Sequence, residues 1–165
     1  MLTDVLSILG FIGSNTNMLG SLSAGQVDKH GNINSTKVGD FFLFGSGGAN
    51  DVSVKAKEIV VTVLQDPRRL VEEVPYITCP GLNVKKLVTD RAVFEKVDGE
   101  LVLTKIFVEK GEKEEEAAEA ILQSMGWTPK RTEMPVRLEA PKQDETLLLR
   151  CFDPDRYFLG KLKKD

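Results

Sequence analysis

The segment FFLFGSGGANDVSVKAKEIVVTVL, residues 41–64, decides the fold class of this chain. Its apolar start, residues 41–44, predicts a short buried strand, and residues 51–57 are expected to form a short helix. Residues 58–64 are rich in β-branched side chains and show little alternation, which predicts a strand buried on both faces. A strand, a glycine-rich turn, a helix and a second buried strand are typical of an α/β sheet.

The loop between the two apolar runs is the candidate functional site, and it reads Gly45-Ser46-Gly47-Gly48-Ala49-Asn50. Glycines lack a Cβ and accept positive φ, so a ligand can approach bare backbone N–H groups there. A turn at a strand end and before a helix is where α/β sheets bind anionic groups or developing oxyanions. The alternative is a purely structural strand-to-helix turn, and the pattern alone favours neither interpretation.

The bulk composition limits the class of protein and its partners. The chain has 165 residues, of which 41% are hydrophobic and 28% charged, and this balance fits one soluble globular domain. A net charge of -3 argues against a nucleic-acid partner, which usually requires a basic surface. No apolar run is long enough to span a bilayer, and the apolar N-terminus lacks the basic residues of a secretory signal. We therefore expect no membrane partner and a cytoplasmic location.

Cysteine and histidine usage points away from a metal site. Cys79 and Cys151 are far apart in the sequence, and His30 is the single histidine, so no Cys/His ligand set is expected. A reduced, cytosolic setting is the default for such a chain. Cys79 is expected to be a buried, inert thiol, because no basic neighbour in the sequence would activate it.

The remaining segments predict a mixture of strands and helices around this centre. Residues 18–27 are rich in small residues and predict a strand, which should share one sheet with residues 41–44 and 58–64 and leave the glycine loop at its edge in a concave site. The other expected elements are a helix at residues 4–9, a helical turn at 67–74, a strand at 76–78, a hairpin of residues 87–97 and 100–108 joined by Asp98-Gly99, a helix at 112–125, an extended surface segment at 127–141, and a tail at 147–164 packed along another surface.

Several motifs, taken in order, resemble the B subunit of class I CoA-transferases, above all the glutaconate CoA-transferase type. Residues 25–35, GQVDKHGNINS, resemble its "GAQVDxxGNxNS" segment, and residues 45–51, GSGGAND, resemble its glycine loop. Residues 88–94, VTDRAVF, resemble its "VTDxAVF" strand. The helix end at Gly126 and the Asp153-Pro154 tail are similar to the C-terminal part of that protein, so the likeness covers nearly the whole chain.

The resemblance implies a fold and a reaction. The fold would be a three-layer α/β/α architecture with a mixed sheet, the NagB/RpiA/CoA-transferase-like fold, in a single domain over residues 1–165 that lacks the family's N-terminal part. The reaction would move CoA between an acyl-CoA and a carboxylic acid, with coenzyme A or acyl-CoA as substrate and no permanently bound cofactor. A glutamate of the enzyme would attack the thioester and carry the CoA as a glutamyl thioester.

The resemblance also implies roles for particular residues. The backbone N–H groups of Gly47 and Gly48 would form the oxyanion hole, and Gly45, Ser46, Gly47, Gly48, Ala49 and Asn50 would bind the CoA thioester. Gln26 and Asn34 would line the substrate site; the alternative is that both only form local hydrogen bonds with the backbone.

One departure from the family pattern concerns the nucleophile. In the family the nucleophilic glutamate precedes the Gly-Gln-Val-Asp segment, whereas the first glutamate of this chain is Glu58. The isolated chain is therefore expected to lack transferase turnover. An A-type CoA-transferase subunit or a second copy is the implied partner, and apolar residues 5–11 are expected to be exposed for such an association. Two other functions stay open, a non-catalytic assembly role and a CoA-thioester hydrolase or lyase activity.

Overall fold

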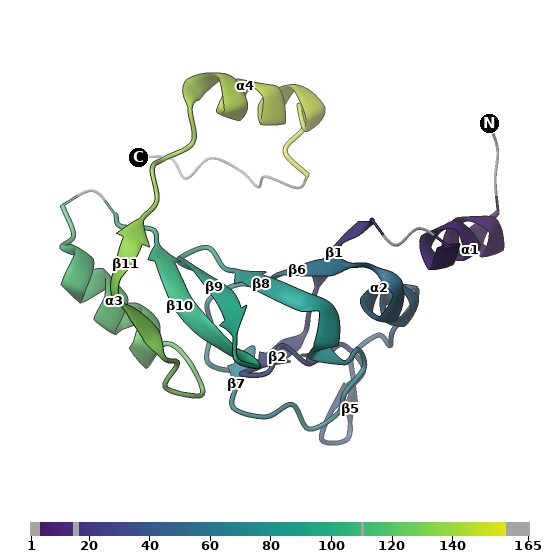
Figure 1. The fold of residues 1–165 in the computed structure, drawn as a ribbon. Helices are drawn as coiled ribbons and strands as arrows, with labels where there is room; N and C mark the ends of the chain where they lie inside the picture. Colours follow the sequence, from purple (N-terminus) through teal and green to yellow (C-terminus); the bar gives the residue numbers. More distant parts are fainter. Residues whose placement is uncertain (1–3, 15–16, 110, 158–165) are drawn as a thin grey trace.

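A six-stranded mixed sheet forms the centre of the computed structural model, which describes residues 4–14, 17–109 and 111–157 (Figure 1). The strands lie in the order β1-β6-β8-β9-β10-β11. Their bounds are β1 Leu19–Ser23, β6 Glu58–Thr62, β8 Val84–Val88, β9 Ala92–Val97, β10 Glu100–Ile106 and β11 Arg131–Arg137. β1, β6 and β8 run parallel, β8, β9 and β10 pair antiparallel, and β11 pairs parallel with β10. The fold is the three-layer α/β/α class with a mixed sheet that the resemblance implied.

Helices flank both ends of this sheet. Their bounds are α1 Val5–Ser14, α2 Ala49–Lys55, α3 Glu114–Gln123 and α4 Gln143–Phe152, with a short 3₁₀ turn at Gly81–Asn83. α2 lies near the β1 end of the sheet and α3 beside β10 and β11 (Figure 1). α4 has no buried residue and stands apart from the sheet. No helix in the described part of the chain is both long and apolar enough to cross a bilayer.

The core lies between the sheet and the helices α2 and α3. Its side chains are mostly valine, isoleucine and leucine, and buried residues alternate with more exposed ones along β6 and β9. The largest fully buried residues are Phe94, Ile33, Ile59, Leu70, Leu87, Leu101, Leu103, Ile106 and Ile121. Residues 58–62 form the predicted strand, but it is not buried on both faces as expected. Ile59, Val61 and Val63 are buried on one face, and Glu58, Thr62 and Leu64 on the other are exposed.

Gly20 allows α2 to pack closely on β1. A Cβ at this position would lie 2.7 Å from Val52 Cγ1 of α2 and 2.5 Å from Ile59 Cδ1 of β6, closer than carbon atoms normally approach. The small residues of this strand were expected to admit another backbone or a ligand. At Gly20, the space is instead filled by the side chains of Val52 and Ile59.

The expectation of one sheet for the first three strands is only partly confirmed. β1 pairs in parallel with β6 over five residues, as expected. The chain then leaves the main sheet, and β2 (Gln26–Asp28) pairs with β3 (Ile33–Asn34) and β7 (Leu70–Val71) in a separate three-stranded sheet. Residues 18–27 therefore form two strands rather than the single strand predicted.

The prediction of a buried strand at residues 41–44 is wrong. Within the described part of the chain, β5 (Phe41–Phe42) pairs only with β4 (Lys37–Val38), and the two form a small separate hairpin. Phe41 is 70% and Phe42 64% exposed. A short apolar run carries no information on whether its strand will be covered, since strands buried in a core and apolar strands at an interface have the same composition.

In the second half of the chain, turn residues predicted the strand pairing more accurately than apolar runs did in the first half. The hairpin at Asp98-Gly99 is confirmed: β9 and β10 pair antiparallel, and the two turn residues have φ of 50° and 84°, as a tight hairpin turn requires. Residues 87–97, however, do not form one strand. A turn at Thr89 separates β8 from β9, because the Thr89 hydroxyl accepts hydrogen bonds from the N–H groups of Arg91 and Ala92.

The remaining element predictions had mixed outcomes. Helices are confirmed at residues 112–125, 51–57 and 4–9, the last extending further as α1. The predicted strand at residues 76–78 is absent from the described structure, where an isolated bridge joins Ile33 to Cys79. The segments at 67–74, 127–141 and 147–164 each contain an element that was not predicted, namely β7, β11 and α4; residues 158–164 lie outside the described part of the chain.

Candidate functional site

The turn between β2 and β3 is organised by one buried carboxylate. Asp28 is 1% exposed, and its Oδ1 accepts hydrogen bonds from the N–H groups of His30 and Asn32, both at 2.9 Å. Its Oδ2 accepts a third from Asn32 Nδ2 at 3.0 Å. Asn32 Oδ1 in turn accepts from the Gly81 N–H at 2.9 Å. Asp28 and Asn32, both from the GQVDKHGNINS motif, thus fix the backbone of the turn through hydrogen bonds, which is the usual role of Asp and Asn in turns.

Asn34 and Gln26, the two residues expected to line the substrate site, contact each other. Asn34 is fully buried; its Nδ2 donates to Gln26 Oε1 at 3.0 Å and to the Lys37 carbonyl at 2.7 Å, while its Oδ1 accepts from the N–H of Thr36. Gln26 is half-buried and donates through Nε2 to the Arg68 carbonyl at 3.0 Å. The hydrogen bonds of Asn34 are local, whereas Gln26 also faces a cavity.

The glycine loop is fixed by backbone hydrogen bonds at its start and is exposed at its tip. The N–H groups of Phe44 and Gly45 donate to the Ser35 carbonyl at 3.3 and 2.9 Å. Gly45 and Gly47 have φ of +85° and +50°, the left-handed region that favours glycine, whereas Gly48 has an ordinary φ of -86°. The N–H groups of Gly47 and Gly48 have no acceptor among the described residues, and both residues are exposed.

The other three loop positions differ in their surroundings. Ser46 accepts a hydrogen bond through its carbonyl from the Ala49 N–H at 2.9 Å, which closes the turn into α2. Ala49 packs against the core, and Asn50 is exposed. The loop therefore presents backbone groups, not a cluster of functional side chains, to its surroundings.

A cavity of about 780 Å³ lies directly before this loop, and we call it the hairpin cavity. The exposed β4–β5 hairpin and the residues that follow it contribute apolar side chains to it, including Leu43 and Phe44, while Gln26 and Arg69 form part of its polar lining. The structure thus places Gln26 near the segment that leads into the loop, and its role as a substrate-lining residue stays a prediction.

A second cavity, of about 450 Å³, lies at the carboxyl ends of the three parallel strands. Ser23, Thr62 and Val88 end β1, β6 and β8 in register, and all three line this strand-end crevice together with Arg69 and Asp90. Open α/β sheets bind ligands at this position. Arg69 was not among the residues predicted from the sequence; the signal was a basic pair, Arg68-Arg69, in a turn after a buried strand.

Electrostatic effects around these cavities are local. The side-chain hydrogen bond from Arg68 lowers the pKa of Asp66 to about 2. Burial lowers the pKa of Lys96, whose ammonium group donates to the carbonyls of His30 and Gly81. Burial raises the pKa of the Cys79 thiol, which is fully buried as predicted. Among the described residues, no group of three or more His, Cys, Asp or Glu side chains is arranged to hold a metal ion.

Comparison with known proteins adds an independent observation. No family model matches the sequence. The chain is 28% identical over 157 residues to the B subunit of 3-oxoadipate CoA-transferase from Pseudomonas knackmussii, a match that covers 82% of this chain and 58% of the relative. It is 32% identical over 69 residues to the B subunit of glutaconate CoA-transferase from Acidaminococcus fermentans, covering 39% of this chain and 26% of that relative. The solved structure of the latter enzyme superimposes with a TM-score of 0.83 at 20% identity, covering 98% of this chain and 70% of that one.

The chain is therefore similar in sequence to the B subunits of two CoA-transferases and shares its fold with one of them. Its matches span little more than half the length of the 3-oxoadipate relative and a quarter of the glutaconate one.

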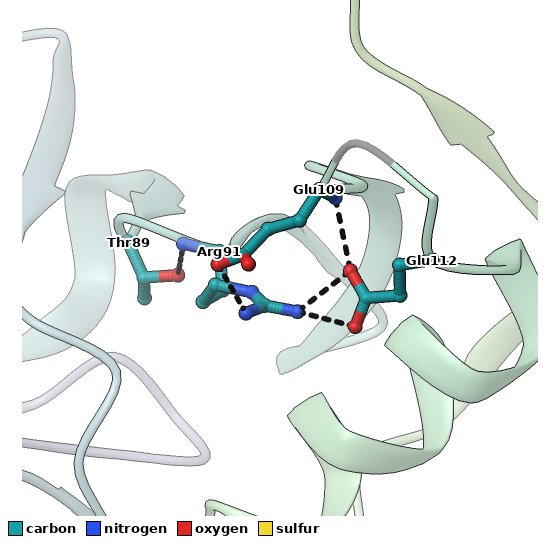
Figure 2. A network of polar contacts seen from close by, with 4 residues as sticks. All are labelled: Thr89, Arg91, Glu109 and Glu112. Carbon is teal, nitrogen blue, oxygen red and sulfur yellow. Dashed lines mark hydrogen bonds and ion pairs between the residues drawn. The ribbon is translucent and has the colours of Figure 1, made fainter. Parts of the chain in front are cut away.

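The third motif that resembles the B subunits, VTDRAVF, spans the turn between β8 and β9. Figure 2 shows its polar contacts: Arg91 donates to the Thr89 hydroxyl through its backbone N–H, and to Glu109 and Glu112 through its guanidinium. The Glu109 N–H also donates to Glu112. The turn is thereby joined to the segment before α3, and it holds Thr89 and Asp90 at the wall of the strand-end crevice.

Proposed function

We propose that this chain contributes the thioester-binding part of a CoA-transferase B subunit, which moves CoA between an acyl-CoA and a carboxylic acid together with a partner chain. The observation that carries the proposal is the pair of N–H groups of Gly47 and Gly48, which have no acceptor among the described residues and lie in an exposed glycine loop. The similarity to the B subunits of two CoA-transferases supports the same function.

The proposed reaction gives these two N–H groups a defined task. A glutamate carboxylate attacks the thioester carbon, and the oxyanion that forms collapses to an acyl-glutamyl anhydride and CoA thiolate. The thiolate then attacks the glutamyl carbonyl and releases the first acid, and the second acid completes the exchange by the reverse steps. Gly47 and Gly48 stabilise the oxyanions, and one such donor contributes about 3 kcal/mol.

The nucleophile in this proposal comes from outside the chain. Glu58 is exposed at the amino end of β6, opposite Leu19, whereas the strand-end crevice lies at the other end, where Ser23 pairs with Thr62. Glu72 forms an ion pair with Lys29 at 3.2 Å on a different surface. These positions support a division of the site between two polypeptides.

Exposed apolar side chains support an association with an A-type subunit or a second copy. They occur on three separate elements, α1, the β4–β5 hairpin with the residues that follow it, and α4. The exposed residues are Val5, Ile8 and Phe11; Phe41, Phe42 and Phe44; and Leu147, Leu148, Leu149 and Phe152. Apolar surface of this kind is typical of interfaces.

A matched pair of glycine variants tests the oxyanion site. Gly39 and Gly47 have φ of +57° and +50°, and a Cβ at either position would have no atom within 4 Å, so Gly39→Val and Gly47→Val carry a similar backbone strain. We expect Gly47→Val to abolish the binding of acetyl-CoA, followed by NMR titration, and Gly39→Val to retain it. Equal binding by both variants would contradict an approach of the thioester to Gly47.

Chemical trapping tests the reaction itself. Hydroxylamine or borohydride is added to the chain with acetyl-CoA, first alone and then with an A-type subunit and the Glu-bearing segment of a B-type one. We expect a glutamyl-CoA adduct only in the complemented mixture. An adduct on Glu58, Glu72 or Glu73 of the isolated chain would assign the nucleophile to this polypeptide. No adduct in the complemented mixture would instead support the non-catalytic or the hydrolase or lyase function.

A further inference from the structure

Arg69 is a half-buried cation without a carboxylate in ion-pair contact. The ion pairs of the described residues use Arg68, Arg91 and Arg137 among the arginines, but not Arg69. Its guanidinium forms a long hydrogen bond, 3.4 Å from Nη1 to the Ala24 carbonyl. A guanidinium has five N–H donors in a planar fork, so most of its capacity is unused.

The backbone holds Arg69 in place from both sides. The N–H groups of Arg69 and Leu70 both donate to the Asp66 carbonyl at 2.9 Å, and the Arg69 carbonyl accepts from the Val27 N–H at 2.7 Å. Its neighbour Arg68 has a side chain that is 88% exposed and paired with Asp66 at 2.7 Å. The two adjacent arginines thus differ in one respect: Arg68 is ion-paired with Asp66, whereas Arg69 interacts with Asp66 at longer range and is in no ion pair among the described residues.

The surroundings of Arg69 combine hydroxyl groups, apolar side chains and two carboxylates. Arg69 lines both the strand-end crevice and the hairpin cavity. In the crevice, the hydroxyl groups of Ser23 and Thr62 lie on adjacent strand ends and have no hydrogen-bond partner among the described residues. Asp90 stands at the wall of the same crevice, where its Oδ1 accepts from the Gln65 N–H at 2.7 Å. Asp66 lines the hairpin cavity, where its carboxylate is paired with Arg68.

We propose that Arg69 binds the carboxylate of a small organic acid through paired hydrogen bonds from its guanidinium, with Ser23 and Thr62 as hydroxyl donors. Arginine suits this task because its planar fork of donors matches the geometry of a carboxylate. The apolar side of the hairpin cavity, which includes Val38, Leu43 and Phe44, receives the carbon chain of the acid. That this acid is the CoA acceptor or donor rests on the proposed transferase function; the binding itself does not.

Binding to the intact chain tests the assignment without any need for turnover. Glutarate, inorganic phosphate and coenzyme A are titrated separately into the wild-type chain and into Arg69→Gln, and the titrations are followed by NMR. Arg150→Gln is the control, because Arg150 is exposed on α4 and lines neither cavity. We expect glutarate to bind the wild type and Arg150→Gln alike, and Arg69→Gln to bind at least tenfold more weakly. Glutarate that fails to bind the wild type, or binds Arg69→Gln equally well, overturns the proposal.

The other ligands and variants separate the alternatives. Phosphate or coenzyme A that binds with the same dependence on Arg69, while glutarate does not bind, identifies the anion as a phosphate group and overturns the carboxylate assignment. If Arg69→Gln does not fold, as judged by circular dichroism, Thr62→Val at the exposed strand end is measured, and a several-fold loss of glutarate affinity is expected; an unchanged affinity in that variant overturns the proposed site. These titrations measure binding and not a reaction. Their outcome therefore does not depend on whether the trapping experiment yields an adduct.

Discussion

Arg91 Nη2 donates to both carboxylate oxygens of Glu112, at 2.9 and 3.1 Å, and so joins the β8–β9 turn to the segment that leads into α3 (Figure 2). The two residues are 21 positions apart in the sequence. Both side chains are about a quarter exposed, so the pair is shielded in part from water. Paired hydrogen bonds of this geometry orient the guanidinium as well as attract it.

The stability of the protein should fall in acid partly through Glu112. The hydrogen bond from the Glu109 N–H, followed by Arg91, lowers the pKa of Glu112 below its usual value of 4.5. A lowered folded-state pKa stabilises the fold above the unfolded pKa, and this stabilisation is lost as pH falls through the folded value. We expect Glu112→Gln to be less stable than the wild type at pH 7, with a difference that shrinks below about pH 4.5.

Urea unfolding between pH 3 and pH 7 measures this dependence. Glu119→Gln is the control, because Glu119 is exposed on α3 and belongs to none of the ion pairs of the described residues. A stability difference for Glu112→Gln that stays constant over the whole pH range would argue against the assignment.

Removing the Asp28 carboxylate should be costly. Asp28 is buried and accepts three hydrogen bonds, so Asp28→Ala leaves two backbone N–H groups and the Asn32 amide without their acceptor. We expect a loss of about 2–3 kcal/mol in the free energy of unfolding. Asp40→Ala, at an exposed position, should change it by less than about 0.5 kcal/mol. Denaturant titration compares the two, and equal effects would be inconsistent with a structural role for Asp28.

The close packing of α2 on β1 can be tested at Gly20. The added methyl group of Gly20→Ala would overlap Val52 and Ile59, and we expect a loss of about 1–3 kcal/mol. Gly10 lies in α1 with open space around its Cα, so Gly10→Ala should cost nothing and strengthen the helix by up to about 1 kcal/mol. Thermal unfolding followed by circular dichroism reports both changes. If Gly20→Ala is as stable as the wild type, α2 can shift away from β1 at little cost in free energy.

The two cysteines should react very differently with a thiol reagent. Cys79 is fully buried, and burial raises the pKa of its thiol, whereas Cys151 is exposed on α4. We expect one equivalent of Ellman's reagent to react with the folded chain and a second only after denaturation. Cys151→Ser should abolish the first reaction. Two equivalents reacting in the native state would indicate that the region around Cys79 opens readily.

Local signals accounted for much of the architecture. The Asp98-Gly99 turn between two apolar runs predicted the β9–β10 hairpin, since few residues other than glycine and Asp or Asn adopt the two positive φ angles that it needs. The acidic start and alanine-rich face of residues 112–125 predicted α3 for an equally local reason, the dependence of helix formation on the nearest turns. The motifs in their order also indicated the B-subunit-like character that the comparisons support.

By itself, the sequence determined which segments form helices, strands and turns in much of the chain, because backbone dihedral preferences and side-chain periodicity act within a few residues. Only the tertiary structure decided which strands share a sheet and which side chains meet. β5 lies in a separate hairpin and not beside β1 and β6, and Ser23, Thr62 and Arg69 meet in one crevice although Ser23 is distant from the other two in the chain. The physical reason is that strand register and loop closure depend on packing between distant segments, which no local pattern encodes.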